Sequence, residues 1–148
     1  VSGQSQRVEI YKRISLIRSQ EDRLQLVDDL LDRFGEPPQE VMTLMDIALL
    51  RSLAGLAGSD MVTFGAGFLT LRLKEEYIED LHILVEALKD SPLTLVGGKK
   101  TALVLSLPQA DDEAALRQGI TAMEQLTARM DKLAEEKKKK TTAILNNH

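Results

Sequence analysis

The sequence predicts an α+β fold, with N-terminal helices, two β-hairpins forming a small antiparallel sheet, and a long C-terminal helix. Three observations support this class. Apolar residues recur at helical spacing over residues 5–56, they alternate over residues 61–73 and 93–107, and helical spacing returns after Pro108. The changes between helical and alternating spacing of the apolar residues therefore predict two β-hairpins with helices before, between and after them.

Two helices are predicted at the N-terminus, over residues 5–18 and 20–34. Ser19 is the expected N-cap of the second, because Asp22 follows three positions later as in a capping box. Gly35 is expected to end that helix in a left-handed conformation. The apolar side chains expected to face the core are Val8, Ile10, Tyr11, Ile14, Ile17, Leu24, Val27, Leu30, Leu31 and Phe34.

A third helix is predicted over residues 38–56, because proline is tolerated in the first turn of a helix. Gly55 and Gly58 are expected to end it. The helix is apolar nearly all round, which is typical of a central, buried helix. Its apolar residues are Val41, Leu44, Met45, Ile47, Ala48, Leu49, Leu50 and Leu53.

Two hairpins follow. Residues 61–64 and 68–73 are expected to be strands joined through residues 65–67, and residues 93–96 and 102–107 are expected to form the second pair. Between the hairpins a fourth helix is predicted over residues 76–89. The apolar face of this helix comprises Tyr77, Leu81, Leu84 and Leu88.

The last helix is expected to begin near Asp111 and Asp112, whose charges suit a helix N-terminus. From Glu135 the pattern decays into lysine-rich sequence. Residues 1–136 are therefore predicted to be a single α+β domain, and residues 137–148 a frayed or disordered tail. The apolar stripe of the helix comprises Ile120, Met123, Thr127, Met130 and Ala134.

Composition narrows the function. The 148 residues include 19 basic and 23 acidic side chains, for a net charge of −4, which argues against a general nucleic-acid binder. The absence of Cys excludes disulfides and thiolate chemistry. No apolar run approaches the ~18 residues of a membrane span, so we expect a cytoplasmic protein without membrane contact. The chain begins with Val1 instead of Met, so we expect an excised fragment or a cleaved tag and not a natural start.

Motifs for catalysis, metal or cofactor binding are not found. His82 is expected at the surface and His148 in the tail, and neither has metal-ligand spacing with carboxylates. Residues 97–101 contain Gly-Lys-Lys-Thr, but the spacing of a phosphate loop is missing and a strand follows, so a hairpin turn is expected. We therefore predict no catalytic residue, metal site or cofactor.

The carboxylates of the second helix leave several interpretations open. Asp28, Asp29 and Asp32 could form a solvated helix face, a docking face, or a cation or acid-base site. Asp29 and Arg33 are expected to pair, since they are four residues apart with the acid first. The lysines of residues 137–140 could solubilise the tail or contact phosphate or a membrane surface.

Several motifs resemble the C-terminal domain of the bacterial transcription-repair coupling factor (Mfd) family. They are Glu9, the Tyr-Lys-Arg-Ile of residues 11–14, the Asp-Arg-Phe-Gly of residues 32–35, Pro38 and the Asp-Ile-Ala-x-Leu-Arg of residues 46–51. The resemblance extends from about residue 7 to about residue 134 and is densest over residues 9–54.

The resemblance implies a regulatory domain of an ATP-dependent DNA translocase that displaces stalled RNA polymerase and recruits UvrA. The domain would pack on the UvrB-like N-terminal module of the same protein, mask its UvrA-binding surface and repress the motor until polymerase is engaged. DNA would be contacted only by other domains. The matching interface residues here are Asp29, Asp32 and Arg33, of which Asp29 replaces the family's usual Glu. We expect the fragment to be a monomer.

Two alternatives remain from the residues alone. One is a freestanding enzyme or small-molecule binder that uses the carboxylates of the second helix. The other is an oligomerising α+β module, in which Ile120, Met123, Thr127 and Met130 form an exposed seam along the last helix.

Overall fold

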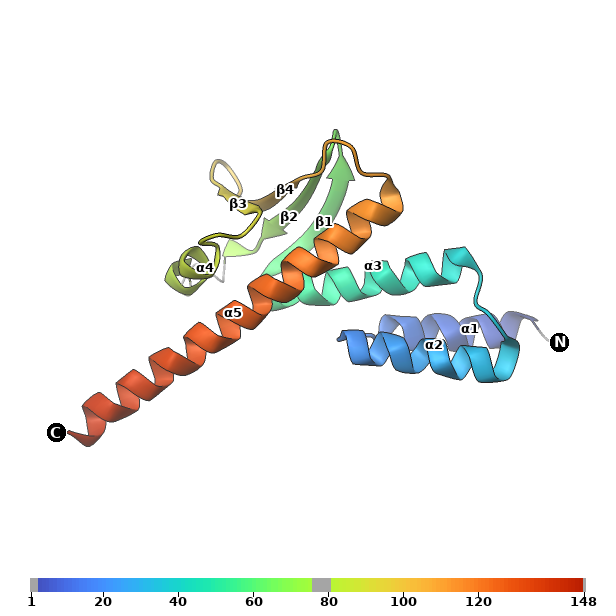
Figure 1. Ribbon diagram of the computed structural model, residues 1–148, viewed down its shortest axis with the longest axis horizontal. Helices are drawn as coiled ribbons and strands as arrows, with labels where there is room; N and C mark the ends of the chain where they lie inside the picture. Colours follow the sequence, from blue (N-terminus) through green and yellow to red (C-terminus); the bar gives the residue numbers. More distant parts are fainter. Residues whose placement is uncertain (1–2, 76–80, 148) are drawn as a thin grey trace.

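The computed structural model describes residues 3–75 and 81–147. Over these residues the helices and strands follow one another in the predicted order (Figure 1). They are α1 (Gly3–Ser15), α2 (Gln20–Phe34), α3 (Gln39–Leu56), β1 (Ser59–Gly65), β2 (Phe68–Leu73), α4 (Leu81–Ala87), β3 (Leu93–Val96), β4 (Ala102–Ser106) and α5 (Asp112–Asn146).

The four strands form one antiparallel sheet in the order β1-β2-β4-β3. Each hairpin pairs its own strands, and β2 joins the hairpins by pairing with β4, with Leu69 opposite Leu105 and Leu71 opposite Leu103. Because partners in register point to the same side of a sheet, these leucines form one apolar face. The predicted α+β class and small antiparallel sheet are confirmed.

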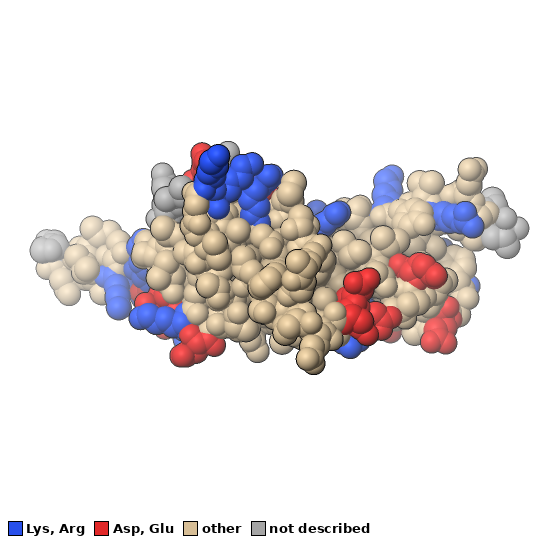
Figure 2. Space-filling model, turned by 90° about the horizontal axis from the view of Figure 1, so that it is seen from above, with Lys and Arg blue, Asp and Glu red and all other residues tan. Residues whose placement is uncertain are grey.

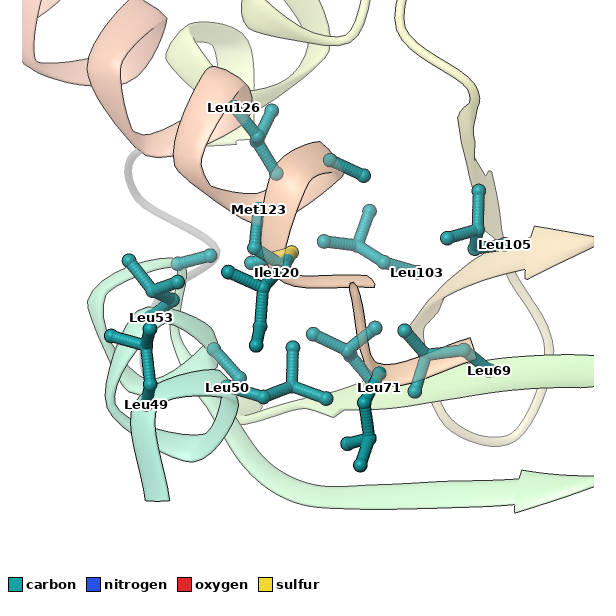
Figure 3. Close-up of a cluster of buried hydrophobic side chains, with 14 of the residues drawn as sticks. Leu49, Leu50, Leu53, Leu69, Leu71, Leu103, Leu105, Ile120, Met123 and Leu126 are labelled. Atoms are coloured by element: carbon teal, nitrogen blue, oxygen red, sulfur yellow. The ribbon is translucent and has the colours of Figure 1, made fainter. Parts of the chain in front are cut away.

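The core lies between that sheet face and the helices α3 and α5. Figure 3 shows leucines of β2 and β4 directed toward Leu50 of α3 and Met123 of α5. Gly119 allows α5 to approach closely, since a Cβ there would lie 2.8 Å from Leu69 Cδ2. The core is aliphatic, in keeping with an aromatic content of 3 %.

The helices α1 and α2 lie side by side, next to α3 and away from the sheet (Figure 1). The predicted N-cap is confirmed, because Ser19 Oγ accepts a hydrogen bond from the backbone N–H of Asp22 at 3.2 Å. Gly35 ends α2 with φ of +83°, as its position predicts. Ser52 Oγ donates to the carbonyl of Ile17 at 2.7 Å and so fastens the α1–α2 connection to α3.

The predicted inward faces of α1 and α2 are partly wrong. Val8 and Tyr11 of α1 are 63 % and 54 % exposed, and most of the predicted stripe of α2 is also exposed. The α2 residues in the core are Leu26 and Leu30. At about 100° per residue this face is rotated by roughly a quarter turn from the predicted one. The reason is that α2 packs against α1 and α3 together, and the stripe of α2 lies beside those contacts instead of within them.

The fourth helix begins, within the described residues, at Leu81. Leu84 is buried and Leu88 half-buried, as predicted, whereas Tyr77 lies outside the described residues. Arg129 of α5 donates from its guanidinium to the carbonyl oxygens of Lys89 and Glu86. These bonds satisfy carbonyls at the C-terminal end of α4, where arginine is a favourable partner.

The last helix begins as predicted, with Asp111 as N-cap accepting a hydrogen bond from the N–H of Ala114 at 2.8 Å. The predicted stripe is confirmed in Ile120, Met123 and Thr127, which are buried. The lysine-rich segment, which was predicted to be a frayed or disordered tail, belongs to α5 in the structure. This helix continues to Asn146 with exposed side chains after Ala134. Ala, Glu and Lys are strong helix formers, and a helix already nucleated by packing propagates through them at little cost. Among the described helices, none is long and apolar enough to cross a membrane.

Candidate protein-interaction surface

The three predicted interface residues lie in the last turns of α2. At about 100° per residue, Asp29, Asp32 and Arg33 fall within a sector of roughly 100° on the helix. They therefore share one side of α2, but the structure gives each a different environment.

Asp29 is engaged within the domain. Arg13 of α1 donates from Nη2 to Asp29 Oδ2 at 2.6 Å, and Gln25 donates from Nε2 to Oδ1 at 3.1 Å. The hydrogen bond from Arg13 is the main reason why the pKa of Asp29 lies below its usual value. Asp29 therefore links α1 to α2, and about a third of its side chain remains exposed.

Arg33 does not form its ion pair with Asp29, so the predicted pairing is wrong. Its Nη1 lies 3.6 Å from Glu9 Oε1 of α1, and both side chains are 60 % exposed. Asp29 is instead held by Arg13, because α1 presents its own arginine directly across from the carboxylate. The Arg33 guanidinium also lies 6.0 Å from the centroid of the Phe34 ring, at the outer limit of a cation–π contact.

Asp32 is the carboxylate that is available to a partner. It is exposed, and no hydrogen bond or ion pair to it is found within residues 3–75 and 81–147. Asp28 is likewise exposed on the neighbouring turn. An exposed carboxylate next to a weakly held arginine can exchange its water contacts for charge-assisted hydrogen bonds across an interface.

Apolar side chains next to these charges were missed as interface candidates. Leu24, Leu31 and Phe34 are 54 %, 45 % and 50 % exposed and lie on one stripe of α2. The sequence shows these residues as an apolar stripe, but an apolar stripe on a helix predicts burial in the core and not an exposed binding surface. With Asp32 and Arg33 beside it, the stripe gives α2 a mixed apolar and charged surface, which is the composition of many protein-binding faces.

The hollow that lies between α1 and α2 is too small to hold a small-molecule ligand. The hollow beside Arg33 has a volume of about 10 Å³, roughly one water molecule. Ligand sites are usually hundreds of cubic ångströms. This hollow therefore gives no support to the alternative of an enzyme or small-molecule binder that uses these carboxylates. The residues that line the hollow are Gln6, Glu9, Ile10, Arg13, Leu30, Arg33 and Phe34.

The oligomerisation seam is also not available. Ile120, Met123 and Thr127 are buried in the domain, and Met130 is half-buried against the core. Thr127 satisfies its hydroxyl internally by donating to the carbonyl of Met123 at 2.8 Å. A seam would require these side chains at the surface.

An ion pair between α2 and α3 positions the candidate surface. Arg23 Nε lies 2.7 Å from Asp46 Oδ1, and both side chains are mostly buried. The N–H does not align with the oxygen well enough for a hydrogen bond, so the contact is electrostatic. Arg23 and Asp46 thus hold α2 against α3 while Asp32 remains at the outer side.

The remaining polar motifs form no site with this surface. His82 is exposed, as predicted, with Nε2 3.2 Å from Lys137 Nζ, whereas His148 lies outside the described residues. Residues 97–101 form the predicted turn between β3 and β4.

Comparison with known proteins points to one family. The family model of the TRCF domain matches residues 1–84. Transcription-repair-coupling factors of two strains of Staphylococcus epidermidis are 27 % identical to the chain over 82 residues, which is 55 % of this chain and 7 % of theirs. The chain thus spans less than a tenth of the length of these relatives.

A solved structure has a similar fold. It is the crystal structure of the C-terminal domain of a transcription-repair coupling factor, with a TM-score of 0.71 and 24 % sequence identity. The alignment covers 84 % of this chain and 81 % of that one.

Proposed function

This chain belongs to the TRCF domain family, and from that premise we propose that it is the regulatory C-terminal domain of a transcription-repair coupling factor. In this proposal the domain binds the UvrB-like N-terminal module of the same protein and masks the surface that recruits UvrA. The parent protein is an ATP-dependent DNA translocase that stays repressed until it engages stalled RNA polymerase. The role of the domain itself is binding and not catalysis.

The observation that carries the proposal is the exposed side of α2. Asp32 is available without an internal partner among the described residues, and Arg33 is held only by a 3.6 Å contact with Glu9. Exchanging these weak contacts for intermolecular ones costs little, because both side chains already lie in water. We assign the charge contacts with the partner to Asp32 and Arg33.

Asp29 has a different part in the proposed interface. Its carboxylate already accepts hydrogen bonds from Arg13 and Gln25. We infer that it contributes mainly by fixing α1 against α2 and leaves at most part of its surface to the partner. A charged interface of this kind provides specificity and can open again, as a repressive contact must.

The test is calorimetric titration of this chain with a separately purified UvrB-like N-terminal module at low and moderate salt. The wild-type chain should bind in a salt-sensitive manner. The double variant Asp32→Arg/Arg33→Asp should bind at least about tenfold more weakly, because like charges then face each other across the interface.

A matched control is the double variant Asp131→Lys/Lys132→Glu, which reverses an adjacent acid and base on the exposed part of α5. It should bind like the wild type. Equal binding by wild type and the α2 variant would overturn the site. If neither the wild type nor the α2 variant binds in trans, the experiment is repeated with the chain linked covalently to the N-terminal module, since a linker supplies an effective concentration in the millimolar range. Absence of docking in the linked protein would overturn the proposal.

A further inference from the structure

A large cleft lies at the end of the sheet, far from the side of α2 described above. Its volume is about 1040 Å³, and it is bounded by the end of α3, the ends of the strands, α4 and the middle of α5. The charged residues at its rim are Asp60, Arg72, Lys74, Glu75, Lys99 and Lys100.

The floor of the cleft is apolar and incompletely covered. Leu73, Leu81, Leu95 and Met130 line it and are only half-buried against the core, while Leu56 at its margin is 67 % exposed. These side chains come from β2, α4, β3, α5 and α3, so the fold brings them together from across the chain. A contiguous apolar surface left open in this way is typical of a binding site.

Among the described residues of the rim, four basic side chains outnumber two carboxylates, in a chain whose net charge is negative. Arg72 is neutralised by Asp60, which accepts hydrogen bonds from its Nε at 2.9 Å and its Nη2 at 3.2 Å. The hydrogen bond from Arg72 holds the pKa of the Asp60 carboxyl below its usual value. Lys99 and Lys100 are exposed and form no ion pair within the described residues.

Lys99 and Lys100 lie on the turn that follows Gly97 and Gly98. A side-chain Cβ at either glycine would meet no atom within 4 Å, so the turn stands clear of the rest of the fold. Figure 2 shows several Lys and Arg side chains grouped along the upper edge of the molecule, left of its centre, with acidic side chains beside them and a broad uncharged surface below. Because the whole chain has a net charge of −4, this basic cluster is opposite in sign to the overall charge.

We propose that the cleft binds an acidic amphipathic segment of a partner protein. The apolar side chains of this segment would occupy the floor of the cleft, and the carboxylates of the segment would pair with Lys99 and Lys100 at the rim. Apolar anchors with a charged border are the usual division of labour in peptide recognition.

The geometry favours a protein segment over other anions. The volume of about 1040 Å³ is at the upper end of the range for small ligands, and the polar groups lie at the rim and do not converge on a single point. Nucleic acid is disfavoured because the described part of the lining contains no aromatic side chain on which a base could stack.

The test uses a short fluorescent peptide that combines Glu with Leu, and a matched peptide in which every Glu is replaced by Gln. Anisotropy titrations with the full chain should give salt-dependent binding of the acidic peptide. The Gln peptide should bind about tenfold more weakly. The double variant Lys99→Glu/Lys100→Glu should lose a similar factor for the acidic peptide.

The matched control is Lys138→Glu/Lys139→Glu, which reverses two exposed lysines on the terminal part of α5. It should bind the acidic peptide like the wild type. Equal effects of the two double variants, or equal binding of the two peptides, would overturn the proposal. Absence of any binding by the wild type would do so as well.

Nuclear magnetic resonance places the site and separates it from the docking surface. The acidic peptide should shift signals of Leu81, Leu95 and Met130 and leave those of Asp32 and Arg33 unchanged. Shifts centred on α2 would overturn the assignment to the cleft. Stronger binding of dodecanoate or of a single-stranded oligonucleotide than of the peptide, at the same residues, would overturn the class of ligand.

Discussion

Asp29 and Asp32 lie three residues apart on the same helix, yet their surroundings give them different tasks. Asp29 accepts hydrogen bonds from Arg13 and Gln25, so its charge is used inside the domain. Asp32 faces solvent, so its charge remains free for a partner. The neighbouring Arg33 belongs with Asp32 in this respect, because its contact with Glu9 is long and exposed.

The pKa of Asp29 gives a prediction at this scale. The hydrogen bond from Arg13 stabilises the ionised carboxylate and lowers its pKa below the ordinary 3.8. Because the folded-state pKa is depressed, the contribution of Asp29 to stability is present above pH 3.8 and is lost as the pH falls through the lower folded value. We expect NMR titration of the Asp29 carboxyl to give a midpoint below 3.8.

The variant Arg13→Gln should return that midpoint toward 3.8, because the charged donor is lost. Arg33→Gln serves as the control and should have a smaller effect, since Arg33 acts on Asp29 only through its charge at longer range. A midpoint in the wild type at the ordinary value would show that the Arg13–Asp29 contact does not persist in solution.

At the scale of elements, the neighbours of a helix decide which of its faces is buried. α2 carries apolar residues over a sector of roughly 160°, and the contacts with α1 and α3 select Leu26 and Leu30 for the core. α5 has a single clear stripe, of which Ile120, Met123 and Thr127 are buried as the periodicity predicts, whereas Met130 and Ala134 are half-buried. The close packing of α5 depends on Gly119, which lies against Leu69 and Leu50.

Two glycines in helices should therefore respond in opposite ways to alanine. Gly55→Ala should raise the free energy of unfolding by about 0.5–1 kcal/mol, because a Cβ there meets no neighbour. Gly119→Ala should lower it by about 1 kcal/mol, since the cost of overpacking against the fully buried Leu69 exceeds the gain in helix propensity. Urea denaturation of both variants measures the difference. Equal stabilisation by the two substitutions would mean that Leu69 moves aside freely.

At the scale of the whole molecule, α5 connects regions with different degrees of burial. Its first half packs against α3 and the sheet, and its C-terminal part extends away from the other helices and strands (Figure 1). The side chains beyond Ala134 are exposed. The proposed docking side of α2 and the proposed peptide cleft lie at separate places on the fold, so either could be occupied without covering the other's named residues.

Truncation tests the boundary of the packed domain, which we predict at residue 136. Removing residues 137–148 should change the free energy of unfolding by no more than about 0.5 kcal/mol, because the described residues lost are exposed. Truncation after residue 125 is the control and should prevent folding, since it removes the buried Leu126 and Thr127. A marked loss of stability in the shorter truncation, measured by urea denaturation, would move the boundary into the lysine-rich segment.

Much of the fold could be predicted because its information is local. The Ser19 cap, the turn glycines and the alternating leucines of β2 each determine a start, an end or a period from a few neighbouring residues. The candidate site could be predicted only in part. Asp32 was correctly expected at the surface, but the partner of Asp29 could not be found, because Arg13 is 16 residues away and reaches it only when α1 folds beside α2.

Local sequence patterns are sufficient to specify the order of the helices and strands, their caps and turns, and the motifs of the TRCF family. These depend on backbone conformation and on side-chain identity, which are properties of short segments. The packing of the folded chain determines which face of α2 is buried, which arginine pairs with Asp29, and that six separate helices and strands line a cleft beside Lys99 and Lys100. Those features depend on how distant segments pack, since competing apolar faces and ion pairs of similar energy are selected only by the neighbours that the fold supplies.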